Sequence, residues 1–163
     1  MPIDRTEYTG APLTVTERGL FWHHVAIMET WEKPHIEAYV RRVLSEHKPE
    51  SVLEIGYGLG YTARAIHDFG VARHIIVECH PDVIAEARQW AADKPRVELL
   101  YGFVEDIELP TDIDLIWDDR HTLTNYGDDW IERVGAAHYV KFDELDMMQM
   151  TVEEHRQFQL GGT

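Results

Sequence analysis

Two kinds of hydrophobic pattern alternate along most of the chain. Residues 34–47 repeat apolar side chains at intervals of three and four, which predicts an amphipathic helix with Pro34 in its first turn. Short apolar runs that predict buried strands follow, at residues 51–55, 73–78, 96–101, 113–117 and 138–142. Segments with helical spacing separate or follow them, at residues 60–69, 81–90, 128–137 and 151–160.

Strands that alternate with helices at this spacing form parallel βαβ units. The sequence therefore predicts an α/β fold, with a mostly parallel sheet and helices on both of its faces. We find no internal repeat and no boundary between two domains. We expect one domain, with an N-terminal arm or lid at residues 1–33, a Rossmann-like core at 34–142 and a C-terminal extension at 143–163.

Charge narrows the classes of partner. The 163 residues include 30 acidic side chains and 15 Lys plus Arg, giving a formal charge of −15. This balance disfavours nucleic acid and anionic membranes, and it is compatible with a cationic small molecule, although solubility alone also explains it. The one cysteine, Cys79, rules out an intrachain disulfide, and such usage is typical of a reducing cytoplasm.

A glycine-rich segment joins the first strand of the predicted core to the next helix. Glu54-Ile-Gly56-Tyr57-Gly58-Leu-Gly60 places an acid and three glycines at the carboxyl end of that strand, where open α/β sheets bind ligands. The dinucleotide fingerprint Gly-x-Gly-x-x-Gly has its third glycine one position later. The spacing is instead that of the first motif of class I S-adenosylmethionine (SAM) methyltransferases.

Acidic residues follow the other strands of the predicted sheet. Glu78 ends the second strand, where a carboxylate can accept hydrogen bonds from ribose hydroxyls. Glu105 and Asp106 follow the third strand, and Asp118 and Asp119 end the fourth. Ordinary roles as solvated turns or helix caps remain alternatives for the last two pairs. We expect no metal site, because the ten histidines show no ligand spacing.

Four separated segments resemble guanidinoacetate N-methyltransferase and the related arginine N-methyltransferases. They are HVAIMETWEKP (residues 24–34), SVLEIGYGLG (51–60), IIVECH (75–80) and GFVED (102–106). The resemblance implies a class I methyltransferase fold with SAM as cofactor. That fold has seven strands, whereas five are found here, so the sheet is truncated relative to the class. A homodimer that completes the pocket would reconcile these numbers.

The resemblance also implies roles for individual residues. It implies a cofactor site formed by the glycine motif, the acid after the second strand and their neighbours: Met28, Glu54, Gly56, Tyr57, Gly58, Gly60, Glu78, Cys79, Val104, Glu105 and Asp118. The guanidinium-binding carboxylates of the family fall on Glu32 and Asp118. These two would orient a guanidino or amino acceptor and remove its proton during N-methylation.

The segment after the fourth strand departs from the family pattern. The chain reads Trp-Asp-Asp-Arg-His where the family has Tyr-Asp-Thr-Tyr-Pro, and Arg120 brings a positive charge to the acceptor side. Two alternatives therefore stay open: a SAM-fold cyclase, lyase or alkyl transferase, and a SAM-binding protein without catalysis. Residues 101–154 hold 15 of the 30 acids and 3 Lys or Arg, which favours a cationic small-molecule substrate.

Overall fold

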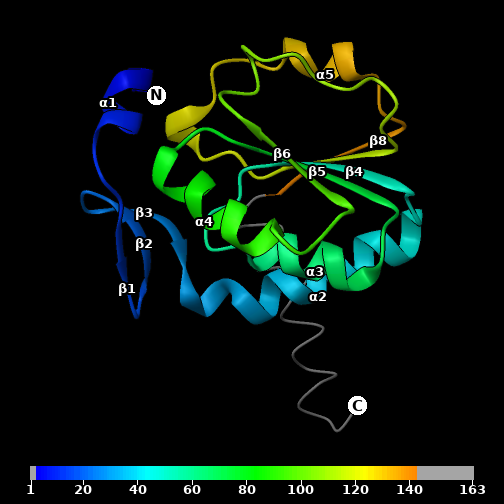
Figure 1. Ribbon diagram of the computed structural model, residues 1–163, viewed down its shortest axis with the longest axis horizontal. Coiled ribbons are helices and arrows are strands. Elements are labelled where there is room, and N and C mark those ends of the chain that lie inside the picture. The colour runs from blue at the N-terminus through cyan, green and yellow to red at the C-terminus, as the bar shows by residue number, and fades with distance from the viewer. Residues whose placement is uncertain (1–2, 143–163) are drawn as a thin grey trace, which may run out of the picture.

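A five-stranded parallel sheet forms the centre of the molecule, as the computed structural model shows for residues 3–142. Its strands are β4 (Ser51–Ile55), β5 (Arg73–Glu78), β6 (Val97–Tyr101), β7 (Leu115–Asp118) and β8 (His138–Lys141). They lie side by side in the order β6-β5-β4-β7-β8 (Figure 1). The predicted α/β fold with a parallel sheet is thus confirmed. The helix expected at 151–160 lies outside the described residues.

Helices cover both faces of this sheet (Figure 1). The helices α2 (Lys33–His47), α3 (Tyr61–Phe69) and α4 (Pro81–Ala91) pack on one face, where they bury apolar side chains of the strands. The short α5 (Asp129–Val134) and the loops around it pack on the other face. Within residues 3–142, no helix combines the length and the apolar character needed to cross a membrane.

The ends of the helices follow local sequence signals. Gly60 and Gly70 flank α3 in left-handed conformations, and Pro81 opens α4. The helix predicted at 128–137 is shorter than expected, because Gly135 adopts a left-handed conformation directly after Val134 and its N–H bonds to the Ile131 carbonyl.

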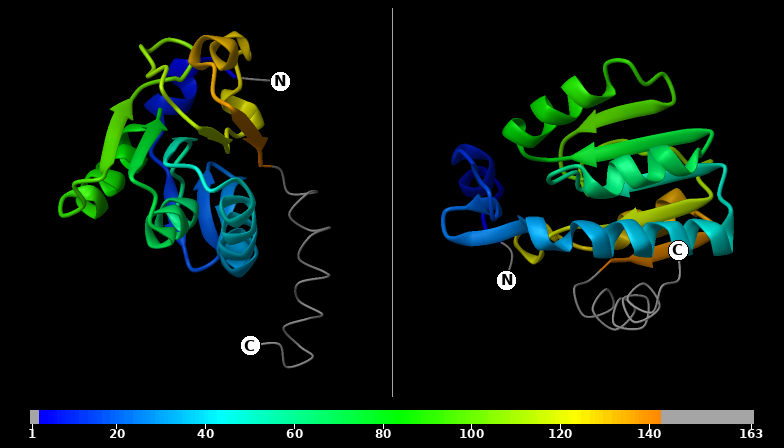
Figure 2. Two further views of the ribbon diagram at one scale, coloured as in Figure 1. Left: turned by 90° about the vertical axis from the view of Figure 1, so that its right-hand side faces the viewer. Right: turned by 90° about the horizontal axis from the view of Figure 1, so that it is seen from below.

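Residues 3–32 contain more regular structure than the predicted arm or loops. They form α1 (Arg5–Gly10), a small antiparallel sheet of β1 (Thr14–Thr16), β2 (Gly19–Trp22) and β3 (Val25–Glu29), and the 3₁₀ turn η1 (Thr30–Glu32). Figure 2 shows this unit at one end of the main sheet. Its strands are too short to give a clear period-two pattern. The feature that could have indicated this sheet is the pair of tight turns between its strands, at Gly19 and at His23 (φ 52°).

The strand order creates a crevice at the centre of the main sheet. From β4 the chain winds outward through β5 and β6, and then returns to β7 on the opposite side of β4. Loops that leave β4 and β7 therefore separate at their carboxyl ends, which is the position where open α/β sheets bind ligands.

Candidate active site

A cavity of about 380 Å³ opens at the carboxyl ends of the parallel strands. Its walls come from the loops that follow β4, β5, β6 and β7 and from β3, with single residues from α1 (Tyr8), from η1 (Glu32) and from directly after β8 (Phe142). This volume lies in the range of small-molecule sites. The cavity thus joins the main sheet to the small N-terminal sheet.

The glycine loop after β4 forms the base of the cavity. Gly56 and Gly58 line it with φ values of 93° and 57°, which side chains rarely tolerate. A β-carbon at Gly56 would lie 3.0 Å from the carbonyl oxygen of Asp119, and one at Gly58 would lie 2.8 Å from the Met28 methyl. The absence of side chains therefore lets the backbone approach both a ligand and the neighbouring walls.

Glu78 fixes the geometry of this loop. Its Oε1 accepts a hydrogen bond from the Tyr57 N–H (2.8 Å), and its Oε2 accepts from the N–H groups of Cys79 (2.9 Å) and His80 (2.8 Å). The side chain is buried yet lines the cavity. Oε1 accepts only one of these bonds, so its second lone pair can still accept a bond from a hydroxyl of a ligand.

The loops after β5 and β6 form the wall next to Glu78. Cys79, Phe103, Val104 and Glu105 line the cavity here. Burial, and then the charge of Glu78, raises the pKa of the Cys79 thiol, so this cysteine stays protonated and is a poor nucleophile at neutral pH. The wall is therefore mostly apolar with one acid, which suits a flat heterocyclic ring.

Glu54 does not reach the cavity. Its carboxyl is fully buried beneath the sheet face covered by α3 and α4, where Oε1 lies 2.8 Å from Nε2 of His74. Burial, followed by the charge of Glu78, raises the pKa of Glu54 well above its usual value. Burial also lowers the pKa of His74 to about 3. The pair therefore shares one proton and supports β4 and β5 from behind the glycine loop.

Asp118 also points away from the cavity. It ends β7 with 1% exposure, and its two oxygens accept from Nε and Nη2 of Arg120 at 2.9 and 2.8 Å. The Tyr139 hydroxyl on β8 donates a third hydrogen bond at 2.5 Å. Asp118 thus already holds a guanidinium, in the forked geometry that a guanidino substrate would use.

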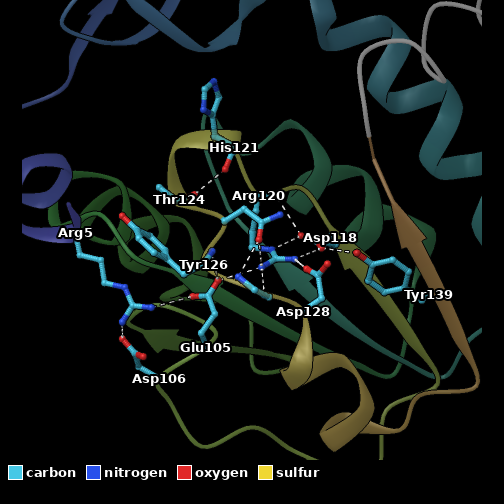
Figure 3. Close-up of polar contacts among 12 residues, drawn as sticks. Arg5, Glu105, Asp106, Asp118, Arg120, His121, Thr124, Tyr126, Asp128 and Tyr139 are labelled. Atoms are coloured by element: carbon cyan, nitrogen blue, oxygen red, sulfur yellow. Dashed lines mark hydrogen bonds and ion pairs between the residues drawn. The ribbon is translucent and has the colours of Figure 1, made fainter. Parts of the chain in front are cut away.

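Arg120 connects the loop after β6 and residues 125–128 to this carboxylate (Figure 3). Besides Asp118, it donates to oxygens of Glu105 (3.0 Å), Asn125 (3.2 Å), Gly127 (2.8 Å) and Asp128 (2.7 Å). Burial opposes its charge, yet these bonds raise the pKa of Arg120 overall. All five N–H groups of the guanidinium are used, so none remains to bind a ligand.

Asp119 lines the cavity beside Gly56. Its backbone N–H bonds to the Ile55 carbonyl at 3.0 Å, but its carboxylate has no hydrogen-bond or ion-pair partner among residues 3–142. Burial is the main cause that raises the pKa of Asp119 well above its usual value, and nearby carboxylates, Glu54 and Glu32 among them, raise it further. A carboxylate in such surroundings favours either a proton or a cationic ligand.

Glu32 lies at the same end of the cavity as Asp119. Its Oε2 accepts the Glu29 N–H at 2.6 Å, which completes a capping box at η1. Both Glu29 and Glu32 line the cavity. Together with Asp119 they make this end strongly acidic, whereas the other end is bounded by Glu78 and Val104.

The structure brings most of the residues expected at the site to one cavity. Those lining it are Met28, Glu32, Gly56, Gly58, Glu78, Cys79, Val104 and Glu105. Four others lie behind this first layer: Glu54, Tyr57, Gly60 and Asp118. The sequence did not reveal Tyr8, Phe103 or Phe142 as lining residues. The position of Asp119 at the end of the fourth predicted strand indicated a site residue, but the sequence analysis gave the site role to Asp118 instead.

The lining residues fit SAM as a cofactor. The open glycine loop, the buried acid Glu78 with a free lone pair on Oε1 and the apolar wall at Val104 suit the amino acid, ribose and adenine parts of such a molecule, respectively. Among residues 3–142, no group of three or more His, Cys, Asp or Glu side chains is arranged to hold a metal ion.

Known methyltransferases share sequence similarity with this chain. Protein arginine N-methyltransferase 2 of Kluyveromyces lactis is 32% identical over 100 residues, which cover 59% of this chain and 23% of that protein. Malonyl-[acyl-carrier protein] O-methyltransferase of Anoxybacillus flavithermus is 34% identical over 86 residues, covering 52% of this chain and 32% of that protein. The match thus spans less than a third of the length of each of these relatives.

Similar solved structures include the methyltransferase PaMTH1 of Podospora anserina with bound S-adenosylhomocysteine (SAH). It is 28% identical with a TM-score of 0.43, and the match covers 52% of this chain and 39% of that chain. A sequence profile described as guanidinoacetate N-methyltransferase matches residues 14–131, which include β1 to β7 and the cavity walls that they position. Because this match covers most of the chain, the protein belongs to the guanidinoacetate N-methyltransferase family.

Proposed function

We propose that this protein is a SAM-dependent methyltransferase that methylates a nitrogen of a small guanidino or amino compound. One observation carries the proposal: a single cavity joins a cofactor-type wall, built on Gly56 and Glu78, to an acidic end that contains Glu32 and Asp119. Membership of the family supports the same activity.

The residues at the cofactor end mainly position the bound molecule. The backbone of Gly56 and Gly58 supports it, and Glu78 binds its hydroxyls while remaining fixed by three N–H groups. When bound, SAM supplies a methyl group that its sulfonium already activates. The chain therefore needs to hold the acceptor in line and to exclude water, which can lower the barrier by about 7–11 kcal/mol in favourable cases.

The acidic end acts on the acceptor. A guanidinium or ammonium nitrogen is protonated at neutral pH, so a carboxylate must bind the cation and accept the proton as the nitrogen–carbon bond forms and the carbon–sulfur bond breaks. The resemblance of the sequence assigns this role to Glu32 and Asp118. The name of the arginine N-methyltransferase relatives supports a guanidino acceptor, and the concentration of acids in residues 101–154 supports a cationic one.

Incubation with methyl-labelled SAM and a panel of guanidino and amino compounds tests this proposal. We expect label in the product, with a mass gain of one methyl group. Consumption of SAM without methylation would favour a cyclase, lyase or alkyl transferase instead. Binding without turnover would favour a SAM-binding protein. Either result, in folded protein, would contradict the proposed activity.

We also propose one SAM-binding domain in which residues 1–33 act as a lid. Tyr8 of α1 and Met28 of β3 line the cavity, so ordering of this segment and binding of a ligand are coupled. Hydrogen exchange tests the lid: amides of residues 5–29 should become protected when S-adenosylhomocysteine (SAH) binds. Unchanged exchange at saturation would contradict it.

A homodimer is a further part of the proposal. Within the described residues β8 pairs with β7 alone, and its side chains are largely exposed, including Tyr139 at 39%. An uncovered edge of this kind favours pairing with another chain. Light scattering should give the mass of a dimer, and a monomer at working concentrations would count against it.

A further inference from the structure

Two adjacent carboxylates at the end of β7 differ in position: one is held behind the cavity wall and the other lines the cavity. Asp118 is held by the chain's own guanidinium at Arg120 and by the Tyr139 hydroxyl. Asp119, the next residue, lines the cavity, and no partner for its side chain is found among residues 3–142. The difference lies in direction, because successive side chains leaving a strand point to opposite sides.

We propose that Asp119, and not Asp118, is the carboxylate that binds the cationic nitrogen of the acceptor, together with Glu32. This inference rests on the proposed function and deepens it. Asp118 serves instead as a positioning residue that anchors Arg120.

The two aspartates differ in whether a ligand in the cavity can reach them. Asp118 is 1% exposed and is not part of the cavity wall, whereas Asp119 and Glu32 both are. Release of Asp118 for a substrate would require Arg120 to leave a buried site in which all five of its N–H groups are bonded. Breaking such a buried pair is strongly unfavourable, so a substrate guanidinium does not compete for it.

The negative charges of Asp119 and Glu32 also favour a cation between them. Asp119 and Glu32 line the same cavity, and the charge of Glu32 is one of the causes that raise the pKa of Asp119. Two carboxylates that face each other repel unless a cation or a proton lies between them. A planar guanidinium can donate to both at once. The raised pKa also suits a group that accepts a proton near neutral pH.

The positive charge of Arg120 on the acceptor side would oppose binding of a cation if it were not compensated. Arg120 is neutralised by Asp118, Glu105 and Asp128 (Figure 3). Its guanidinium lies 5.0 Å from the ring centre of Trp130. These acids compensate the charge of Arg120 within the cavity wall. The carboxylates that line the acidic end give it a negative charge, which favours a cation.

Calorimetric titration of the full chain, saturated with SAH, tests the assignment. The probes are guanidinoacetate and agmatine, each compared with its uncharged ureido counterpart, ureidoacetate and carbamoylputrescine. At least one guanidino probe should bind about tenfold or more tightly than its ureido counterpart, which corresponds to ~1.4 kcal/mol. Asp119→Asn should remove this preference and leave the SAH affinity unchanged.

Asp118→Asn provides the matched comparison, because it makes the same change one residue earlier. It should lower the unfolding temperature while the folded protein still prefers the guanidino probe. Asp119→Asn should instead leave the unfolding temperature of the free protein unchanged or raise it, since it removes an unpaired carboxylate. This second readout does not depend on activity.

Two results would overturn the inference: an unchanged guanidino preference in Asp119→Asn, or loss of that preference in folded Asp118→Asn alone. If SAH binds to the wild type but neither guanidino probe does, the inference also falls, while the methyltransferase assignment is decided by its own assay. If SAH does not bind at all, the proposed function fails and the inference fails with it.

Discussion

Neighbouring acids at the end of β7 have different surroundings although they are adjacent in the chain. A sequence motif identifies the strand end, and family resemblance identifies one acid there, Asp118. Only the structure shows that Arg120, two residues later, folds back onto that acid. Side-chain direction after a strand depends on where the strand stops, and β7 ends at Asp118, one residue later than the predicted run.

The residues of the glycine motif were predicted from the backbone conformations that a tight turn requires, and only some of them line the cavity. Gly56 and Gly58 line the cavity because tight turns at strand ends require their conformations. Glu54 belongs to the same motif, but its side chain points into the core, where the partner His74 comes from another strand. Local sequence cannot reveal such a partner, and the binding roles of all these residues stay predictions.

Glu78 offers a test at the residue scale. Glu78→Gln keeps one acceptor oxygen but loses the charge that three N–H groups share. We expect SAH affinity to fall about tenfold and the free energy of unfolding to fall by about 1–3 kcal/mol. Glu98→Gln is the control, because this acid on β6 is exposed and should change either quantity little. Wild-type SAH affinity in Glu78→Gln would contradict the assigned role.

The buried Glu54–His74 pair predicts a particular pH dependence of stability. The folded pair holds one proton, because the pKa of Glu54 is raised above 4.5 and that of His74 is lowered from 6.5 to about 3. The unfolded chain holds none above pH 6.5, one between 4.5 and 6.5, and two below 4.5. The contribution of the pair should therefore be greatest between these values. It should fall by up to ~1.4 kcal/mol per pH unit on either side.

Urea unfolding at several pH values measures this effect as the difference between the wild type and Glu54→Gln/His74→Asn, which cannot titrate at these positions. We expect a difference curve with its maximum at mildly acidic pH. A curve that rises continuously from pH 5 to pH 8 would show instead that the folded pair holds no proton in this range, which would contradict the shared proton.

At the scale of elements, hydrophobic spacing located the strands and helices of the core closely. β4 and β5 have the predicted bounds, because their apolar runs are fully buried between two layers of helix and loop. The small sheet at residues 14–29 was missed, since β1 is exposed on every residue and has no buried face to create a pattern. Such short strands are stabilised by pairing and by contacts with the core, which local sequence does not record.

The glycine loop provides the prediction at this scale. Gly56→Ala should weaken SAH binding about tenfold or more, because the new methyl group meets the Asp119 carbonyl at 3.0 Å and shifts the loop. Gly70→Ala is the matched control, with a similar φ of 98° but no atom within 4 Å of the new β-carbon. Both variants should lose about 1–2 kcal/mol of stability from backbone strain.

Calorimetry and thermal unfolding separate these two effects. Equal loss of SAH affinity in both glycine variants would mean that strain acts through general destabilisation. The special role of the loop next to β7 would then be rejected.

At the scale of the whole molecule, the Arg120 network connects the loops after β6 and β7 to α5 and β8 (Figure 3). Arg5 of α1 extends it by contacting Asp106 and Glu105. The family was predictable from motifs in four segments, and the profile match confirms it. This network was not predictable, because it joins residues up to 101 positions apart in the chain.

Arg120→Met tests the structural weight of the network. It leaves the buried Asp118 without its counter-charge, so the free energy of unfolding should fall by about 3–5 kcal/mol in urea titrations. Asp128→Asn removes an outer partner whose side chain is 60% exposed, and should cost less than about 1 kcal/mol. Similar small losses in both variants would show that Arg120 is a surface contact and that Asp118 is free to serve another role.

The most direct test of the central claim is calorimetric titration of the purified chain with SAH, the product of methyl transfer from SAM. The account predicts saturable binding of one molecule per chain, at the cavity formed by the glycine loop and Glu78. This binding should weaken in Glu78→Gln. A folded protein that releases or absorbs no heat with SAH, and shows no rise in unfolding temperature at saturating concentrations, would contradict the account.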